Sequence, residues 1–226
     1  MALVNSSNLL LNPPNREHIA LLYENKQELH TAISQYINEG LARGQFCVFA
    51  TVHYRDEGYI QDLSSSIVNF KDNLENGSLL MIDLAPLYIA ALLNDIEPFE
   101  KARKLLMEKA KDRKDRHVRF VGDGTGFLFK NKHFDACAVV EQWWQEKPFE
   151  GSYVCPFPKQ FFNGFPHDIY SERAVVVTHD IVLDVSDSNS VKDEQSSILQ
   201  EQLSLSEKIQ ASNIQGTTPD DEGVSN

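Results

Sequence analysis

Short apolar runs alternate with longer amphipathic segments along most of this chain, and this alternation constrains the fold more than any other feature. The run His18–Tyr23 is short and apolar, which is typical of a strand buried on both faces of a sheet. Apolar residues then recur at helical spacing, at Leu29, Ile33, Tyr36, Ile37 and Leu41. Strands that alternate with long helices imply right-handed crossovers and a parallel sheet. The sequence therefore predicts an α/β fold with a mainly parallel sheet flanked by helices.

The remaining elements follow from the same patterns. The first helix begins with a capping-box-like pair, Asn25 and Glu28, and we take Gly40 and Gly44 to mark its end. Further strands are predicted at residues 45–53, 78–84, 117–121, 152–155, 174–178 and 181–185. Further helices are predicted over residues 56–70, from Pro98 onward and over residues 134–146. The glycine-rich segment Gly122–Gly126 is interpreted as a turn.

The end of the chain differs in composition from the rest. Residues 186–226 hold eight acidic and two basic residues, and therefore half of the net charge of −12. They contain no Phe, Tyr or Trp, so they cannot bury enough apolar area to offset the entropy lost on ordering. We expect an N-terminal extension over residues 1–16, one folded domain over residues 17–185 and a disordered acidic tail over residues 186–226.

Composition also excludes several classes of protein. The acidic balance argues against direct nucleic-acid binding, which needs surplus Lys and Arg to neutralise phosphates. No basic segment with an apolar core opens the chain, and no apolar stretch reaches the ~20 residues of a membrane span. The three cysteines are an odd number without disulfide-framework spacing. We expect a cytoplasmic protein with free thiols and no membrane insertion.

Polar residues at the ends of the predicted strands are the candidates for ligand binding, because ligands of parallel sheets lie beyond the carboxyl ends of the strands. From this rule come Tyr23, Glu24, Thr51, His53, Asp83, Gly122 and Asp123, and to them we add His18, Glu141 and His179. We expect one pocket lined by His18, Tyr23, Thr51, His53 and Asp123, with Glu141 approaching from the last long helix. The alternative is a buried polar network that ties helix to sheet.

Several kinds of catalytic site are missing. The first strand-to-helix loop, Glu24–Gln27, has no glycine to cradle a phosphate, which argues against Walker-type nucleotide hydrolysis. No GxSxG nucleophile elbow is present. His133 and Cys137 are four residues apart, but no second ligand pair lies near them in sequence. We therefore expect no catalytic residue, no metal ion and no cofactor.

The order of several motifs resembles the MEDS domain, the methanogen/methylotroph sensory domain of DcmR-like regulators. These motifs are HIALLYEN, INEGLARGQFCVFATVHYRD, GSLLMIDL, HVRFVGDG, the helix segment EQWW, SYVCPFP and VVVTHDIV. The resemblance spans roughly residues 17–185 and implies a RecA-like core without a phosphate loop. It also implies a sensory role, with a small organic, hydrocarbon-derived ligand and a signalling partner protein. Two motifs depart from the family pattern, Gly122-Asp123-Gly124 in place of Gly-Glu-Met, and Cys155-Pro156-Phe157-Pro158 in place of Cys-x-Tyr-Pro or Cys-x-Tyr-Asp.

Three functions remain open at this point. The favoured one is a stand-alone sensory module, which predicts a closed pocket with converging polar groups. The second is a protein-interaction scaffold without ligand, which predicts a filled pocket and a large exposed apolar patch. The third is an enzyme that uses His18, His53 and Glu141, which predicts strongly shifted ionisations at those residues.

Overall fold

The computed structural model describes residues 6–111, 113, 117–147, 150–161 and 178–186. All of them belong to one compact unit, residues 1–186. The strand expected at residues 174–178 lies outside the described residues except for Thr178, and the tail expected from residue 186 lies outside them except for Ser186. Both expectations therefore stay predictions.

Six strands form one sheet, and every strand pair in it is parallel. Their order across the sheet is β3-β2-β4-β5-β1-β6. The strands are β1 (His18–Tyr23), β2 (Phe46–Thr51), β3 (Leu79–Asp83), β4 (Val118–Gly122), β5 (Gly151–Pro158) and β6 (Ile181–Asp184). The predicted α/β class with a mainly parallel sheet is confirmed, and the strands near residues 18, 46, 79, 118, 152 and 181 are where the apolar runs placed them.

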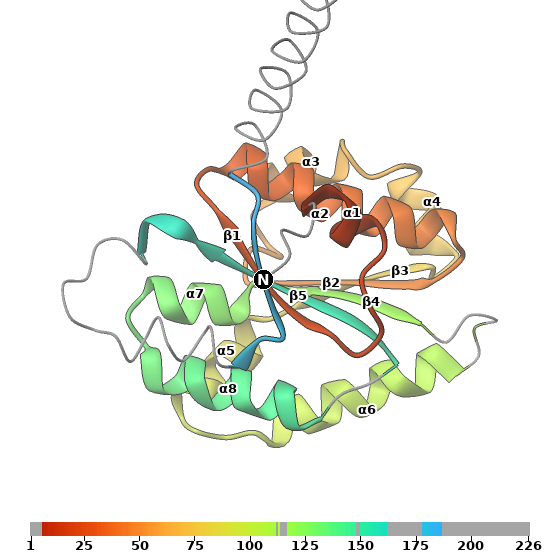
Figure 1. Ribbon diagram of the computed structural model, residues 1–226. Coiled ribbons are helices and arrows are strands. Elements are labelled where there is room, and N and C mark those ends of the chain that lie inside the picture. The colour runs from red at the N-terminus through yellow and green to blue at the C-terminus, as the bar shows by residue number, and fades with distance from the viewer. Residues whose placement is uncertain (1–5, 112, 114–116, 148–149, 162–177, 187–226) are drawn as a thin grey trace, which may run out of the picture. The chain divides into compact units, whose positions relative to one another are not determined.

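Helices cover both faces of this sheet (Figure 1). One face carries α1 (Ser6–Leu11), α2 (Lys26–Ala42), α3 (Glu57–Ser64) and α4 (Phe70–Glu75). The other carries α5 (Ala85–Leu92), α6 (Glu97–Lys111), α7 (Gly124–Lys130) and α8 (Phe134–Glu146). The chain crosses the sheet from β1 to β3 over the first face and returns from β3 to β5 over the second, as crossovers of one hand require. Within the described residues, no helix combines the length and apolar character needed to cross a membrane.

Successive residues of each strand point to opposite faces, so the sheet has a core on either side. On the α2 face, Ile19 and Leu21 of β1 pack with Ile33 and Ile37. On the α8 face, Ala20 of the same strand packs with a second set of apolar side chains from α5 to α8. Strands β2, β4 and β5 are buried along their whole length.

The ends of α2 confirm one capping prediction and correct another. The Asn25 side chain accepts a hydrogen bond from the Glu28 backbone N–H at 3.0 Å, as the capping pattern predicts. Gly44, with φ of +72°, lies just beyond the helix end. Gly40, however, lies inside the helix, and a Cβ there would come within 2.5 Å of the Arg119 side chain. Gly40 therefore serves close packing and does not end the helix.

Three helices were not predicted, α1, α5 and α7, and one predicted helix is divided. The segment expected to form one helix over residues 56–70 forms α3 and α4, separated near Asn69, whose φ is +50°. Helix α7 begins within the segment Gly122–Gly126 that was interpreted as a turn. A Cβ on Gly126 would lie only 1.9 Å from the Pro156 carbonyl oxygen. This glycine lets α7 lie directly on β5, so its role is close approach.

Arg119 of β4 holds α1 and α2 to the sheet from inside the core. Its side chain is 1% exposed and lies over the Tyr36 ring, 5.0 Å from the ring centroid. Its Nε donates to Gln45 Oε1 at 2.7 Å, and its Nη1 donates to the carbonyl oxygens of Leu10 and Tyr36 at 3.0 and 2.9 Å. Its Nη2 donates to the Leu11 carbonyl oxygen at 2.8 Å. One guanidinium thus satisfies the last carbonyls of α1, which have no partner inside that helix.

We expect Arg119→Met to lower the free energy of unfolding by at least about 2 kcal/mol, because the Leu10 and Leu11 carbonyls and the buried Gln45 side chain lose this donor. Urea unfolding measures this loss. The control is Arg55→Met, whose side chain is 89% exposed and should change stability by no more than about 0.5 kcal/mol. Equal effects of the two substitutions would contradict the structural role given to Arg119.

Candidate functional site

A polar pocket of about 270 Å³ lies at the carboxyl ends of β1, β2, β4 and β5. The crossovers that leave β2 and β4 run to opposite faces here, and ligands of open α/β sheets bind at such points. Polar side chains that line the pocket include Tyr23, Glu24, Lys26, His53, Asp123 and Lys130. We call it the edge pocket.

Asp123 is the buried acid of the edge pocket and also joins two strands. Its Oδ2 accepts a hydrogen bond from the Thr51 hydroxyl at 2.5 Å, and its Oδ1 accepts one from the Val52 backbone N–H at 2.8 Å. Burial raises the pKa of the Asp123 carboxyl from 3.8 to about 6, although both hydrogen bonds oppose this rise. Burial and the charge of Asp123 together raise the pKa of Tyr23 to about 12.

The structure separates the residues that were predicted from strand ends. Tyr23, Glu24, His53 and Asp123 line the edge pocket, and the ring of His53 packs against Tyr59 with centroids 4.7 Å apart. Thr51 is fully buried and does not line the pocket itself; its hydroxyl donates to Asp123 and accepts a hydrogen bond from the His53 N–H at 3.0 Å.

Two other strand-end residues lie elsewhere. Asp83 accepts a hydrogen bond from the Ala85 N–H at 2.9 Å and pairs with Arg55 at 3.4 Å. Gly122 lines a different cavity, on the α8 face. Neither residue belongs to the edge pocket.

The expectation of one pocket that also contains His18 and Glu141 is wrong. His18 is the first residue of β1 and Tyr23 is the last, so they lie at opposite ends of the strand. His18 instead meets Glu141 of α8 in the interior of the fold, and His179 joins them there. Whether any of the predicted residues binds a ligand stays a prediction.

The second set of polar side chains is therefore a buried cluster, made of His18, Glu141, Cys155 and His179. Glu141 Oε2 lies 3.1 Å from His18 Nε2 and 3.2 Å from His179 Nε2. His18 Nε2 also lies 3.2 Å from Cys155 Sγ. All four side chains are buried, and we refer to them as the buried cluster. Sequence reasoning missed Cys155 as a member, although it had singled out the motif in which Cys155 lies.

Interactions inside the buried cluster shift the pKa values of two of its members. Burial alone would raise the pKa of Glu141, but interactions with His179 and His18 outweigh it and lower the pKa to about 2. Burial and the Glu141 carboxylate raise the pKa of the Cys155 thiol well above its usual value. The Thr125 hydroxyl helps to lower the Glu141 pKa, yet it makes no hydrogen bond with correct geometry to any described residue.

The buried cluster is the only group of potential metal ligands found among the described residues. Its four donor atoms, two imidazole nitrogens, a thiol sulfur and a carboxylate oxygen, all lie within 4.8 Å of one another. These donor types are the ones that transition metals take in proteins. By contrast, His133 and Cys137 serve other contacts, since His133 packs against Tyr88 and Cys137 Sγ lies 3.5 Å from the Thr125 carbonyl.

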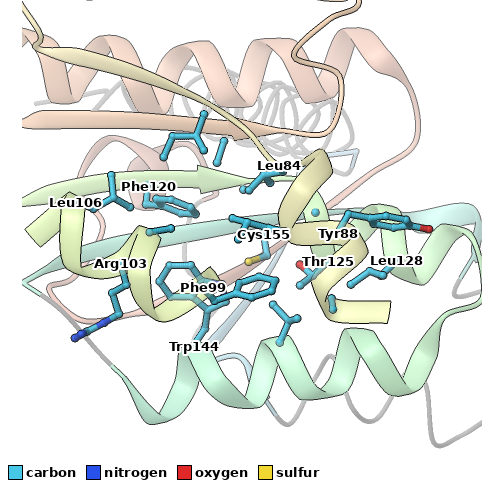
Figure 2. A pocket seen from close by; sticks show the side chains of 18 residues that line it. Leu84, Tyr88, Phe99, Arg103, Leu106, Phe120, Thr125, Leu128, Trp144 and Cys155 are labelled. Carbon is cyan, nitrogen blue, oxygen red and sulfur yellow. The ribbon is translucent and has the colours of Figure 1, made fainter. Parts of the chain in front are cut away.

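An apolar cavity of about 50 Å³ adjoins the buried cluster on the α8 face of the sheet. Apolar side chains from β3, β4, α5, α6 and α8 form most of its wall, and Figure 2 shows Phe99, Phe120 and Trp144 among them. Its polar wall includes the Thr125 hydroxyl and the Cys155 thiol, which lie beside each other in the same view. Cys155 is thus a member of the buried cluster and part of the cavity wall.

The raised pKa of Asp123 predicts a pH-dependent stability. The folded protein holds the Asp123 proton up to about pH 6, whereas the unfolded chain releases it near 3.8. Protonated Asp123 therefore adds to the free energy of unfolding, by at most about 3 kcal/mol. This contribution is fully present below pH 3.8 and is lost as the pH rises through about 6. We expect the stability difference between wild type and Asp123→Asn, measured by urea unfolding, to fall over this range.

A second variant gives the direction of the effect. Thr51→Val removes a hydrogen bond that lowers the pKa of Asp123, so it should move the transition to higher pH. A stability difference between wild type and Asp123→Asn that stays constant from pH 4 to pH 7 would show that Asp123 is ionised throughout.

Comparison with known proteins agrees with this architecture. The family model described as MEDS, the methanogen/methylotroph, DcmR sensory domain, matches residues 17–169. That segment contains β1 to β5, the edge pocket residues, the cavity wall and every member of the buried cluster except His179. A search of curated proteins gives no match. Because the family model covers more than half of the sequence, the chain belongs to the MEDS family of sensory domains.

Proposed function

We propose that this sensory domain binds a small organic molecule in the apolar cavity and passes the signal to a partner protein. The observation that carries the proposal is the cavity itself, which is lined by members of two groups of buried apolar side chains. A scaffold that had lost its ligand would be expected to fill this space, because empty volume in a core costs stability.

The size and lining of the cavity favour a small apolar ligand. A single water molecule needs roughly 10–15 Å³ of such space, so about 50 Å³ accommodates a molecule of a few non-hydrogen atoms. Apolar cavities of this kind exclude water and accept apolar guests. The cavity thus suits the hydrocarbon-derived ligands that the family resemblance implies.

Polar groups at one side of the cavity could orient such a ligand. The Thr125 hydroxyl is buried beside the Cys155 thiol and makes no hydrogen bond of correct geometry with the described residues, so it is open to a ligand. Ligand sites commonly combine an apolar wall with a few polar groups that select one orientation. A short alcohol, carbonyl compound or haloalkane has the matching combination of an apolar body and one polar end.

Helix α5 offers a route from the cavity to the surface. Three of its side chains line the cavity, those of Leu87, Tyr88 and Ala91. On its exposed side, Ile89, Leu92 and Leu93 are 58%, 42% and 75% exposed, which is unusual for large apolar residues. A shift of α5 on ligand binding would move this apolar surface, and we propose that the partner protein binds to this surface.

The two alternatives receive different support. The exposed face of α5 also favours a protein-interaction scaffold, which differs from the sensory proposal only in lacking a ligand. An enzyme that uses His18, His53 and Glu141 together requires one common site, and His53 lies in the edge pocket, away from the other two.

Binding in the cavity can be tested with xenon and with alcohols and haloalkanes of one to three carbons. We expect the melting temperature of the wild-type protein to rise with the concentration of at least one of these probes, because a ligand that binds only the folded state stabilises it. Ala102 lines the cavity, so Ala102→Leu should fill it and abolish the rise. Thermal unfolding at several probe concentrations measures the effect.

The matched control is Ala85→Leu, at an exposed position of α5 outside the cavity wall, which should keep the full response. If wild type fails to respond to any probe while Ala102→Leu is more stable, the cavity is only a packing defect. The scaffold alternative would then be preferred.

A further inference from the structure

We infer that His18, Glu141, Cys155 and His179 form a binding site for a transition-metal ion of the zinc class. The four side chains come from β1, α8, β5 and the segment before β6, and they converge at one place in the α8-face core. No two of these residues are close in sequence, so no local metal-binding motif identifies the site.

The spacing of the donor atoms suits tetrahedral coordination. Metal–ligand distances of about 2.0–2.3 Å place neighbouring ligand atoms about 3.3–3.8 Å apart around a tetrahedral ion. In the buried cluster, His18 Nε2 lies 3.1 Å from Glu141 Oε2 and 3.2 Å from Cys155 Sγ, and His179 Nε2 lies 3.2 Å from Glu141 Oε2. The other three pairs of donor atoms lie within 4.8 Å, so movements of up to about 1 Å would bring all four atoms around one ion.

The tautomer of His18 is already the one that a metal ligand requires. Its Nδ1 lies 3.0 Å from the Thr178 carbonyl oxygen, which can only accept a hydrogen bond, so Nδ1 carries a proton. In the neutral ring, the lone pair of Nε2 therefore faces the other members of the cluster. A backbone carbonyl that fixes the remote nitrogen in this way is the usual support for a metal-binding histidine.

Glu141 is the group that most needs a further partner. The carboxylate is 1% exposed, and neither of its oxygens accepts a hydrogen bond from any residue that the structure describes. The two histidine nitrogens lie near Oε2 but do not have the direction that a hydrogen bond requires. Without an ion, the two histidines alone offset the burial of this carboxylate, whereas a metal ion would coordinate it directly.

The charges also balance with a divalent ion. Without one, ionised Glu141 relies on positive charge on the His18 and His179 rings, whose centroids are only 3.9 Å apart. Two imidazolium cations at that distance, with their ring planes tilted by 34°, would repel each other strongly away from water. A divalent ion with one thiolate, one carboxylate and two neutral imidazoles has no net charge, and binding releases the Cys155 thiol proton.

The test uses the protein purified without chelators and without a metal-affinity step. We expect elemental analysis to find about one zinc-class ion per chain. After removal of the ion by a chelator, added Co²⁺ should give the visible absorption of tetrahedral cobalt together with a thiolate charge-transfer band, and Zn²⁺ should displace it.

Cys155→Ser should remove the charge-transfer band and weaken Co²⁺ binding at least about tenfold. The matched control is Cys137→Ser, because Cys137 is also a buried cysteine of the α8 face but is not a member of the cluster. It should keep both the spectrum and the affinity. If Cys155→Ser does not fold, the wild-type protein still decides the matter, since Zn²⁺ should raise its melting temperature and a chelator should lower it.

Two results would overturn the inference. One is wild-type protein that contains no metal and shows neither a cobalt spectrum nor a thermal response to Zn²⁺. The other is a cobalt spectrum that Cys155→Ser leaves unchanged. Neither result bears on the cavity, because the response to xenon and short organic probes is measured separately on the same protein, so a failure of the metal site and a failure of ligand sensing can be told apart.

Discussion

Burial of a parallel sheet on both faces is the constraint on which the rest of this structure depends. All residues of strands β2, β4 and β5 are buried, so any polar group in or directly beside them needs a partner inside the protein. Arg119 of β4 meets this need with backbone carbonyl groups, and Asp123, directly after β4, meets it with Thr51 and Val52. The buried cluster differs from both, because the Glu141 oxygens accept no hydrogen bond of correct geometry from the described residues.

The two faces of the sheet therefore have different characters. The α2 face is held by the Arg119 hydrogen bonds and by a continuous apolar core. The α8 face is divided between two apolar groups of side chains, with the cavity lined by members of both. A layer with one continuous core on one side and a layer with internal space on the other is a suitable arrangement for a sensor, because a ligand can alter helix positions on one face without loosening the whole domain.

The fold could be predicted from the sequence to a large extent, and the site only in part. Apolar runs and helical spacing identified the parallel sheet and the helices after Asn25 and across residues 134–146, because these signals are local. Helix α7 was missed because the glycines at its start suggest a turn, and only the contact of Gly126 with β5 explains them. His18, Glu141 and His179 were predicted as ligand-binding residues, and this stays a prediction, but His18 and Glu141 were placed in one pocket with Tyr23, at the wrong end of β1.

Cys155 shows why the buried cluster could not be predicted from the sequence. Within an apolar strand, a cysteine behaves as a small hydrophobic residue unless other ligands surround it. The residues that surround it come from positions 18, 141 and 179, and only the order of the strands brings them together. Such convergence depends on which strands are neighbours, which no local pattern contains.

The pairing of β6 with β1 determines how far along the chain the folded domain must extend to cover the edge of β1. His18 N–H donates to the Asp180 carboxylate at 2.8 Å, and the Asp180 N–H donates to the His18 carbonyl oxygen at 2.9 Å. The segment matched by the family model ends at residue 169, before this strand. A protein shortened to that segment would leave β1 as an open, apolar edge, and such edges recruit strands from other molecules. We therefore expect the strand that follows Asp180 to shield β1 from such pairing.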